Sequence, residues 1–275
     1  MESSDSLPYT LFFLLVEIGF GGLIVMAVVD FRGQVTRGFI KATSVMVPMV
    51  LALATWVAFN LAGDIIEGFR LDPGPRDAIV GLMVVITVGS VVHNILLYTD
   101  RDRPAKWLGA GLSVLAIVVL LLAAIMLRIP AWGMGLVFLS LLFGTLAIGL
   151  AAVGLTLGHW YLVSPRLPAQ PLNEITLLLI VVVAVQVVLF AIALIVPVDE
   201  TPSGGRDLPL ADDPTFWLRI VVGLIMPLIF AAMALASSRI RSMMAATGLL
   251  YLVTALILAG EIAARALFFD SARPI

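Results

Sequence analysis

Long apolar stretches alternate with short polar segments along almost the whole chain, and eight of the stretches contain very few charged side chains. A helix of about 20 apolar residues crosses the roughly 30 Å hydrocarbon layer of a bilayer. Such a helix also satisfies every backbone N–H and C=O within its own segment. The pattern therefore predicts eight transmembrane helices, at residues 9–29, 39–62, 78–98, 107–127, 133–163, 175–198, 217–237 and 243–268.

The segments between these stretches are short and rich in helix breakers, such as Asp-Pro-Gly-Pro at 72–75 and Thr-Pro-Ser-Gly-Gly at 201–205. None is long enough to hold a separate extramembrane domain, so residues 1–275 are expected to form one domain. The expected fold class is all-α, a polytopic membrane bundle of eight helices. Residues 1–6 are acidic, unlike the positive start of a cleaved signal peptide, so the first helix is expected to be retained. No repeat of fixed period is visible.

The composition excludes several classes of protein. Hydrophobic residues make up 61% of the chain, charged residues 12%, and the mean hydropathy is +1.14, which leaves too little polar surface for a soluble globule. The absence of cysteine excludes disulfides, thiolate zinc sites, c-type haem attachment and any iron–sulfur cluster held by cysteine of this chain. The chain has no basic run of the kind that binds nucleic acid, and its net charge is −2.

The distribution of Lys and Arg predicts the orientation in the membrane. Cytoplasmic loops retain these residues. Nine of the 16 lie in the first, third, fifth and seventh loops, namely Arg32, Arg37, Lys41, Arg101, Arg103, Lys106, Arg166, Arg239 and Arg241. Both termini, together with the acidic loop at 199–216, are therefore expected on the outer face of a prokaryotic cytoplasmic (inner) membrane.

Four ionisable side chains lie well inside the predicted helices: Glu17, His93, His159 and Glu261. Placing such a group at the bilayer centre costs about 2.5–3.5 kcal/mol on insertion scales, so each is a candidate for function.

The two histidines occur at matched depth. His93 and His159 each precede the cytoplasmic end of their helix by about one and a half turns, which puts both about 7–9 Å inside the inner boundary. If the two helices are neighbours, the imidazoles could ligate the iron of one haem b from its two faces. Gly89, one turn before His93, would leave room for the macrocycle, and Thr156 could orient His159 through its hydroxyl group.

Other interpretations of the histidines stay open. They could take part in quinone binding or proton transfer instead. A histidine near a helix end is also often an interfacial side chain that bonds to a neighbouring helix.

Glu17 lies at mid-membrane in Glu-Ile-Gly-Phe-Gly-Gly, where glycines permit close approach of a helix or a flat ligand. This carboxyl could exchange a proton, or it could serve only as a hydrogen-bonding group between packed helices. Glu261 and Arg265 are four residues apart on the last helix and therefore share one face. The pair could simply neutralise itself, or the carboxylate could accept a proton from a quinol.

Some polar groups and prolines inside the helices have structural interpretations. Asn60, Asn94 and Gln186 are expected to form hydrogen bonds between helices, and Pro48 and Pro227 predict kinks.

The two ends of the chain resemble one family. The first helix, with Glu17 followed by Ile-Gly-Phe-Gly-Gly, resembles the opening helix of the membrane anchor subunits of DMSO and polysulfide reductases. The last helix is similar to the closing helix of the same superfamily, with Glu261, Arg265 and the aromatic pair Phe268 and Phe269. The resemblance implies a quinone-binding subunit that exchanges electrons with an iron–sulfur partner, generally without haem of its own.

The expected function is a membrane anchor or electron-transfer subunit of a prokaryotic respiratory or photosynthetic redox complex. It would contact the lipid bilayer and other subunits, bind menaquinone or ubiquinone, and hold one haem b if the histidines meet. At most it would be the quinone-reactive part of an oxidoreductase. The alternatives are a proton-coupled secondary transporter, with Glu17 as the coupling carboxylate, and a purely structural subunit.

Overall fold

The fold is taken from a computed structural model that describes residues 6–61, 65–66, 69–127, 133–164, 167–195, 210–271 and 273–274. Within these residues, eight helical segments are long and apolar enough to cross a membrane. The predicted fold class, an all-α polytopic bundle, is confirmed.

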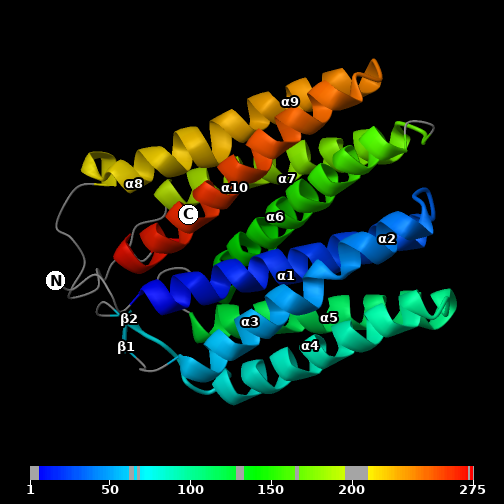
Figure 1. The fold of residues 1–275 in the computed structure, drawn as a ribbon. Coiled ribbons are helices and arrows are strands. Elements are labelled where there is room, and N and C mark those ends of the chain that lie inside the picture. Colours follow the sequence, from blue (N-terminus) through cyan, green and yellow to red (C-terminus); the bar gives the residue numbers. More distant parts are fainter. Residues whose placement is uncertain are drawn as a thin grey trace.

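Consecutive segments along the chain point in opposite directions (Figure 1). They are α1 (Leu7–Arg32), α2 and α3 (Arg37–Ser44 and Met46–Asn60), α4 (Arg76–Tyr98), α5 (Asp102–Met126), α6 (Gly133–Val163), α7 (Gln170–Ile195), α8, η2 and α9 (Pro214–Trp217, Leu218–Ile225 and Met226–Arg239), and α10 (Met243–Ser271). Two short antiparallel strands, β1 (Ile65–Ile66) and β2 (Phe69–Arg70), connect α3 to α4, and a 3-10 turn, η1 (Leu210–Asp212), precedes α8.

The second predicted helix is broken in two between Ser44 and Met46. Pro48 has no N–H to donate to the carbonyl group of Ser44, four residues earlier. The side-chain amide of Asn94 on α4 donates to this carbonyl instead, at 3.1 Å. The kink predicted at Pro48 and the interhelical bond predicted for Asn94 are therefore two parts of one feature. Asn60, by contrast, donates to the carbonyl of Trp56 on its own helix.

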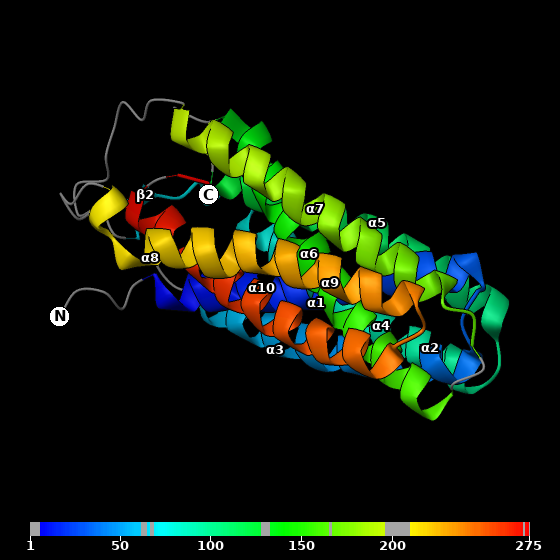
Figure 2. The same cartoon turned by 90° about the horizontal axis from the view of Figure 1, so that it is seen from above.

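The helices form two four-helix bundles. In the first bundle, α1 packs against α3 and α5, and α4 packs against the same two helices. In the second bundle, α6 packs against α7 and α10, and α9 packs against the same two. The second bundle lies above the first in Figure 1, and Figure 2 shows α1 beneath the helices of the second bundle. Each half therefore has the same order of neighbours, a similarity that the sequence pattern did not reveal.

The bundles meet mainly through their first helices, α1 and α6. At this crossing two glycines bring the backbones together. A Cβ atom on Gly21 would lie 2.2 Å from the carbonyl oxygen of Thr145, and one on Gly149 would lie 2.3 Å from the carbonyl oxygen of Gly21. Any side chain at either position would separate the two bundles.

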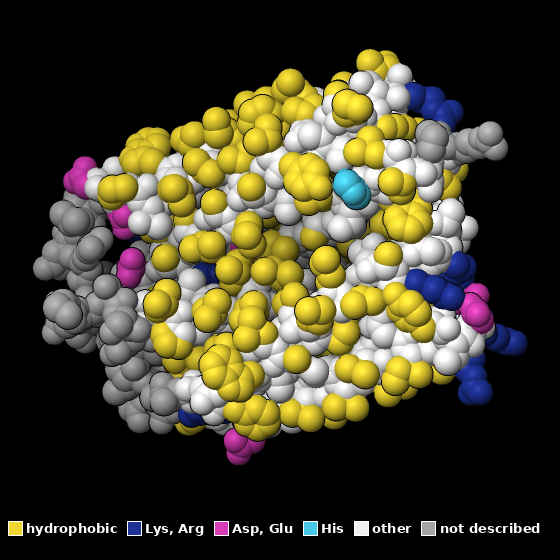
Figure 3. All heavy atoms as spheres, viewed as in Figure 1, with side chains coloured by type: hydrophobic (Ala, Val, Ile, Leu, Met, Phe, Trp, Pro, Cys, Tyr) yellow, Lys and Arg dark blue, Asp and Glu magenta, His cyan; other side chains and the backbone are white. Residues whose placement is uncertain are grey.

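Charged side chains gather at the ends of the molecule, and apolar side chains cover its sides (Figure 3). The loops that follow α1, α4, α6 and α9 form one end, called here the basic end. Lys41 bonds to Asp100 there, and this hydrogen bond and the positive charge of Lys41 lower the pKa of the Asp100 carboxyl group. Apolar sides between polar ends are the surface that a lipid bilayer requires.

The close approach of α1 and α6 at Gly21 and Gly149 can be tested by substitution. We expect Gly149→Ala to lower the free energy of unfolding by about 1–3 kcal/mol, because its methyl group has no space against the backbone of Gly21. The matched control is Gly111→Ala on α5, where an added Cβ meets no atom within 4 Å. Thermal unfolding in detergent measures both variants. Equal melting temperatures for the two would contradict the close crossing.

Candidate functional site

Three of the candidate residues meet in one buried cluster between the bundles. Nη2 of Arg265 on α10 lies 2.9 Å from Oε1 of Glu17 on α1 and 3.3 Å from Oε2 of Glu261. The predicted pairing of Glu261 with Arg265 across one helical turn is observed. Because Glu17 belongs to the first bundle and Arg265 to the second, this contact joins the bundles.

Two further residues complete the cluster. Nη1 of Arg219 on η2 lies 3.2 Å from Oε1 of Glu261, and the amide nitrogen of Gln186 on α7 donates to the same oxygen at 2.6 Å. The interhelical bond predicted for Gln186 is therefore found. Arg219 is buried, and it was not among the candidate residues expected from the sequence. Its position inside the predicted helix 217–237 was the signal for a buried partner.

The helix that carries Arg219 has unusual geometry. Residues Leu218–Ile225 form a π-helix, a rare conformation that often occurs at functional sites. It changes to the α-helix α9 at Met226, next to Pro227, where the sequence predicted a kink. A Cβ on Gly260 of α10 would lie 2.2 Å from Cα of Gly223, so η2 and α10 touch through their backbones. This close crossing lets the Arg219 side chain reach Glu261.

A third glycine makes room for the carboxylates. A Cβ on Gly144 of α6 would lie 2.7 Å from Oε2 of Glu261 and 2.9 Å from Oε1 of Glu17. Ser140, one turn earlier on α6, accepts a bond from Arg265 through its carbonyl oxygen at 3.4 Å. Helix α6 therefore forms one wall of the cluster.

The cluster is balanced in charge but unevenly bonded. Two carboxylates face two guanidinium groups, and all four side chains are at least 96% buried. Within the part of the chain that the structure describes, Glu261 is approached by Arg219, Arg265 and Gln186, whereas Glu17 has only Arg265 as a close partner. Oε2 of Glu17 has no hydrogen-bond partner among the described residues. Glu17 is therefore the carboxyl group best placed to gain or lose a proton.

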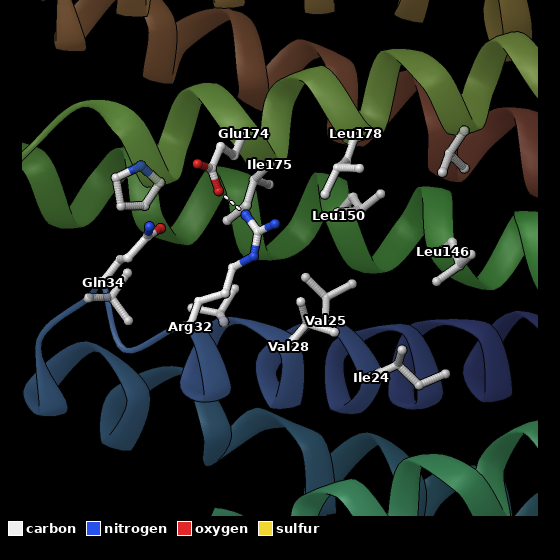
Figure 4. A pocket seen from close by; sticks show the side chains of 14 residues that line it. Ile24, Val25, Val28, Arg32, Gln34, Leu146, Leu150, Glu174, Ile175 and Leu178 are labelled. Carbon is white, nitrogen blue, oxygen red and sulfur yellow. Dashed lines mark hydrogen bonds and ion pairs between the residues drawn. The ribbon is translucent and has the colours of Figure 1, made fainter.

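A groove runs between the bundles on the basic side of this cluster (Figure 4). Its walls are α1 and α7, its floor is α6, and its empty volume is about 710 Å³, including the open side. Val28 and Leu178 on its walls are 48% and 43% exposed, so the groove opens on the lipid-facing surface. It is lined by Ile24, Val25, Val28, Val29, Arg32, Gln34, Val35, Leu146, Leu150, Pro171, Glu174, Ile175, Leu178 and Val182.

The two ends of the groove differ in polarity. At the basic end, Arg32 of α1 forms an ion pair with Glu174 of α7 across the groove, and the two side chains point toward one another in Figure 4. Gln170 donates to the other oxygen of Glu174 at 2.8 Å. The deep end is apolar and reaches Val182, one helical turn before Gln186 of the cluster. The sequence pattern does not reveal this site, because Arg32 and Glu174 lie at helix ends, where charged side chains are common.

The two histidines do not face each other, so this expectation is wrong. His93 is half-buried on α4 beside α5, where a Cβ on Gly109 would lie 3.2 Å from its Nε2. His159 is exposed on α6. Helix α4 packs against α3 and α5 at the lower edge of Figure 1, whereas α6 packs against α1, α7 and α10. A similar distance from the helix end does not make two helices neighbours.

The expected supporting residues for a haem have other roles. A Cβ on Gly89 would lie 2.5 Å from Cδ2 of Leu112, so this glycine permits packing of α4 on α5 and leaves no clearance for a macrocycle. The hydroxyl group of Thr156 donates to carbonyl oxygens of its own helix at 3.0 Å. The described residues thus form no bis-imidazole haem site, nor do three or more of their His, Asp or Glu side chains converge as a metal site.

Comparisons of the chain with models of protein families, with curated proteins and with solved structures gave no match. The resemblance of the first and last helices to reductase anchor subunits therefore stays a prediction.

The balance of two carboxylates and two guanidinium groups in the cluster can be tested by removing one charge. We expect Arg219→Met to lower the free energy of unfolding by about 3–5 kcal/mol, because it leaves a buried carboxylate without its counter-charge. Adding Glu261→Gln should restore part of the loss, since Glu17 and Arg265 then balance each other. The matched control is Arg239→Met, an exposed arginine at the end of α9. The free energy of unfolding of all three variants is measured in mixed detergent micelles. Equal losses of stability for Arg219→Met and Arg239→Met would contradict a role for Arg219 as a buried counter-charge.

Proposed function

We propose that the chain is an integral membrane subunit of a prokaryotic respiratory or photosynthetic redox complex, and that it binds a quinone, either menaquinone or ubiquinone. The observation that carries this proposal is the groove between the bundles. It is open to lipid, polar at its basic end, and apolar along the rest of its length. Ligand sites of this kind, mostly apolar with a few polar groups that fix orientation, are typical for small molecules.

The buried cluster supports the proposal in a second way. Quinone reduction and quinol oxidation move protons as well as electrons, and protons need acceptor groups inside the membrane. Glu17 and Glu261 are such groups, and Gln186 links Glu261 to the helix wall of the groove. Arg265 would balance the charge of either carboxylate. In this proposal the electrons pass to or from a partner subunit, because the chain has no cysteine to hold an iron–sulfur cluster.

The proposed location is a prokaryotic inner membrane, with the basic end in the cytoplasm and both termini on the outer face. The support is the bias of Lys and Arg toward the basic end, which follows the rule for cytoplasmic loops.

A proton-coupled transporter is the second candidate. The observation that favours it is the similar order of neighbours in the two bundles, with buried ionisable groups at their junction. Transporters are often built from two such repeats with the coupling site between them. In that case Glu17, the carboxylate with the fewest partners, would carry the coupled proton.

Purification from native membranes separates the two candidates. We expect the tagged chain to retain redox subunits and a quinone, and Glu261→Gln to lower quinol turnover of that complex by about tenfold or more, since one proton acceptor is lost. A Gln186→Leu variant tests the link to the groove, and Arg239→Met serves as the surface control. A chain that purifies alone, without quinone, and drives proton-coupled uptake in liposomes would overturn the redox proposal in favour of a transporter.

A further inference from the structure

We infer that the groove holds the quinone with its ring at the basic end, between Arg32, Gln34 and Glu174, and with its isoprenoid tail along α1 and α7. The inference rests on the proposed quinone function. It adds the position and direction of the ligand, which neither the resemblance nor the buried cluster provides.

The polar groups of the groove lie together at one end. Arg32, Gln34 and Glu174 are the polar side chains that line the groove, and all three lie at its basic end. The deep end is formed by Ile24, Leu146 and Val182 and offers no hydrogen-bonding side chain. A quinone ring carries two carbonyl oxygens, which lose hydrogen bonds to water on binding unless donors replace them. Only the basic end supplies such donors.

The charges at the polar end of the groove balance each other. Arg32 and Glu174 form an ion pair, so the polar end of the groove has no net charge. A neutral ring can accept a bond from Arg32 or Gln34 while the ion pair persists, and Glu174 can accept a bond from a quinol hydroxyl group. A phospholipid phosphate would have to displace Glu174 from Arg32. The groove is thus better matched to a neutral head than to an anionic one.

The groove has the length and the open side that a quinone with an isoprenoid tail needs. Eight residues of α7 separate Glu174 from Val182, which corresponds to about 12 Å along the helix. This length accommodates the beginning of an isoprenoid tail, and the exposed walls let the remainder lie in the bilayer. The side chains of Arg32 and Glu174 are 49% and 30% exposed, so a ring can reach them from the interface.

This position separates ligand binding from the buried cluster. None of Glu17, Glu261 and Arg265 lines the groove, and these residues lie beyond its deep end. The ring therefore contacts the basic end, and Glu174 is the first proton acceptor that it meets. Glu17 and Glu261 receive a quinol proton only after transfer along α7, over about 18 Å between Glu174 and Gln186.

Photolabelling of the full chain in native membranes tests the inference. The probes are azido derivatives of a short-chain ubiquinone and a short-chain menaquinone, and labelled peptides are identified by mass spectrometry. We expect labels in residues 28–35 and 170–178, and removal of the label by unlabelled quinone. Val28→Trp places an indole in the groove from an exposed position and should lower labelling by about tenfold. The double variant Arg32→Gln/Glu174→Gln should lower it similarly.

The control is Val114→Trp, the same change at a 60% exposed position on α5, and it should leave labelling within about twofold of the wild type. Labels in the outer halves of α1 and α10, or full labelling of Val28→Trp, would overturn the inference while leaving a quinone function in place. If phosphatidylethanolamine removes the label and unlabelled quinone does not, the groove binds lipid, and the inference is overturned as well. Absence of quinone-specific labelling anywhere in the chain, with no quinone in the purified complex, would overturn the proposed function itself.

Discussion

The contact between Arg265 and Glu17 is the interaction on which the arrangement of the two bundles depends. An ionised side chain inside hydrocarbon is costly unless an opposite charge accompanies it. Among the described residues, Glu17 is the only member of the cluster from the first bundle, and its close counter-charge comes from the second. Separating the bundles would leave a carboxylate on one side and an excess positive charge on the other. The cost of that separation favours a single way of docking α1 on α6 and α10.

Glycines make this docking possible. Gly21 and Gly149 bring α1 and α6 into backbone contact, and Gly223 and Gly260 do the same for η2 and α10. Gly144 then leaves space for the carboxylates themselves. In a membrane, where lipid is as apolar as a helix side chain, close packing of small residues and polar contacts supply much of the attraction between helices. The charges and the glycines therefore act together, since neither brings Arg265 to Glu17 alone.

The hydrophobic pattern was sufficient to predict the number of helices and the fold class, because a bilayer imposes the length of each span. It also identified Glu17, Glu261 and Arg265, since ionisable groups in apolar stretches are rare. It could not predict which helices are neighbours. For that reason His93 and His159 were paired wrongly, and the groove between α1 and α7 was not found. Arg219 was missed because it lies near the end of the predicted helix 217–237, and the sequence does not show the π-helix and glycine crossing that accompany its contact with Glu261.

The most direct measurement of the central claim is a double-mutant cycle between Glu17 and Arg265. The free energy of unfolding in mixed micelles is measured for the wild type, Glu17→Gln, Arg265→Gln and the double variant. If the two side chains join the bundles, their coupling energy should be about 1–3 kcal/mol, with the double variant less destabilised than the sum of the single ones. Additive effects of the two substitutions would show that the bundles dock without this contact and would contradict the account.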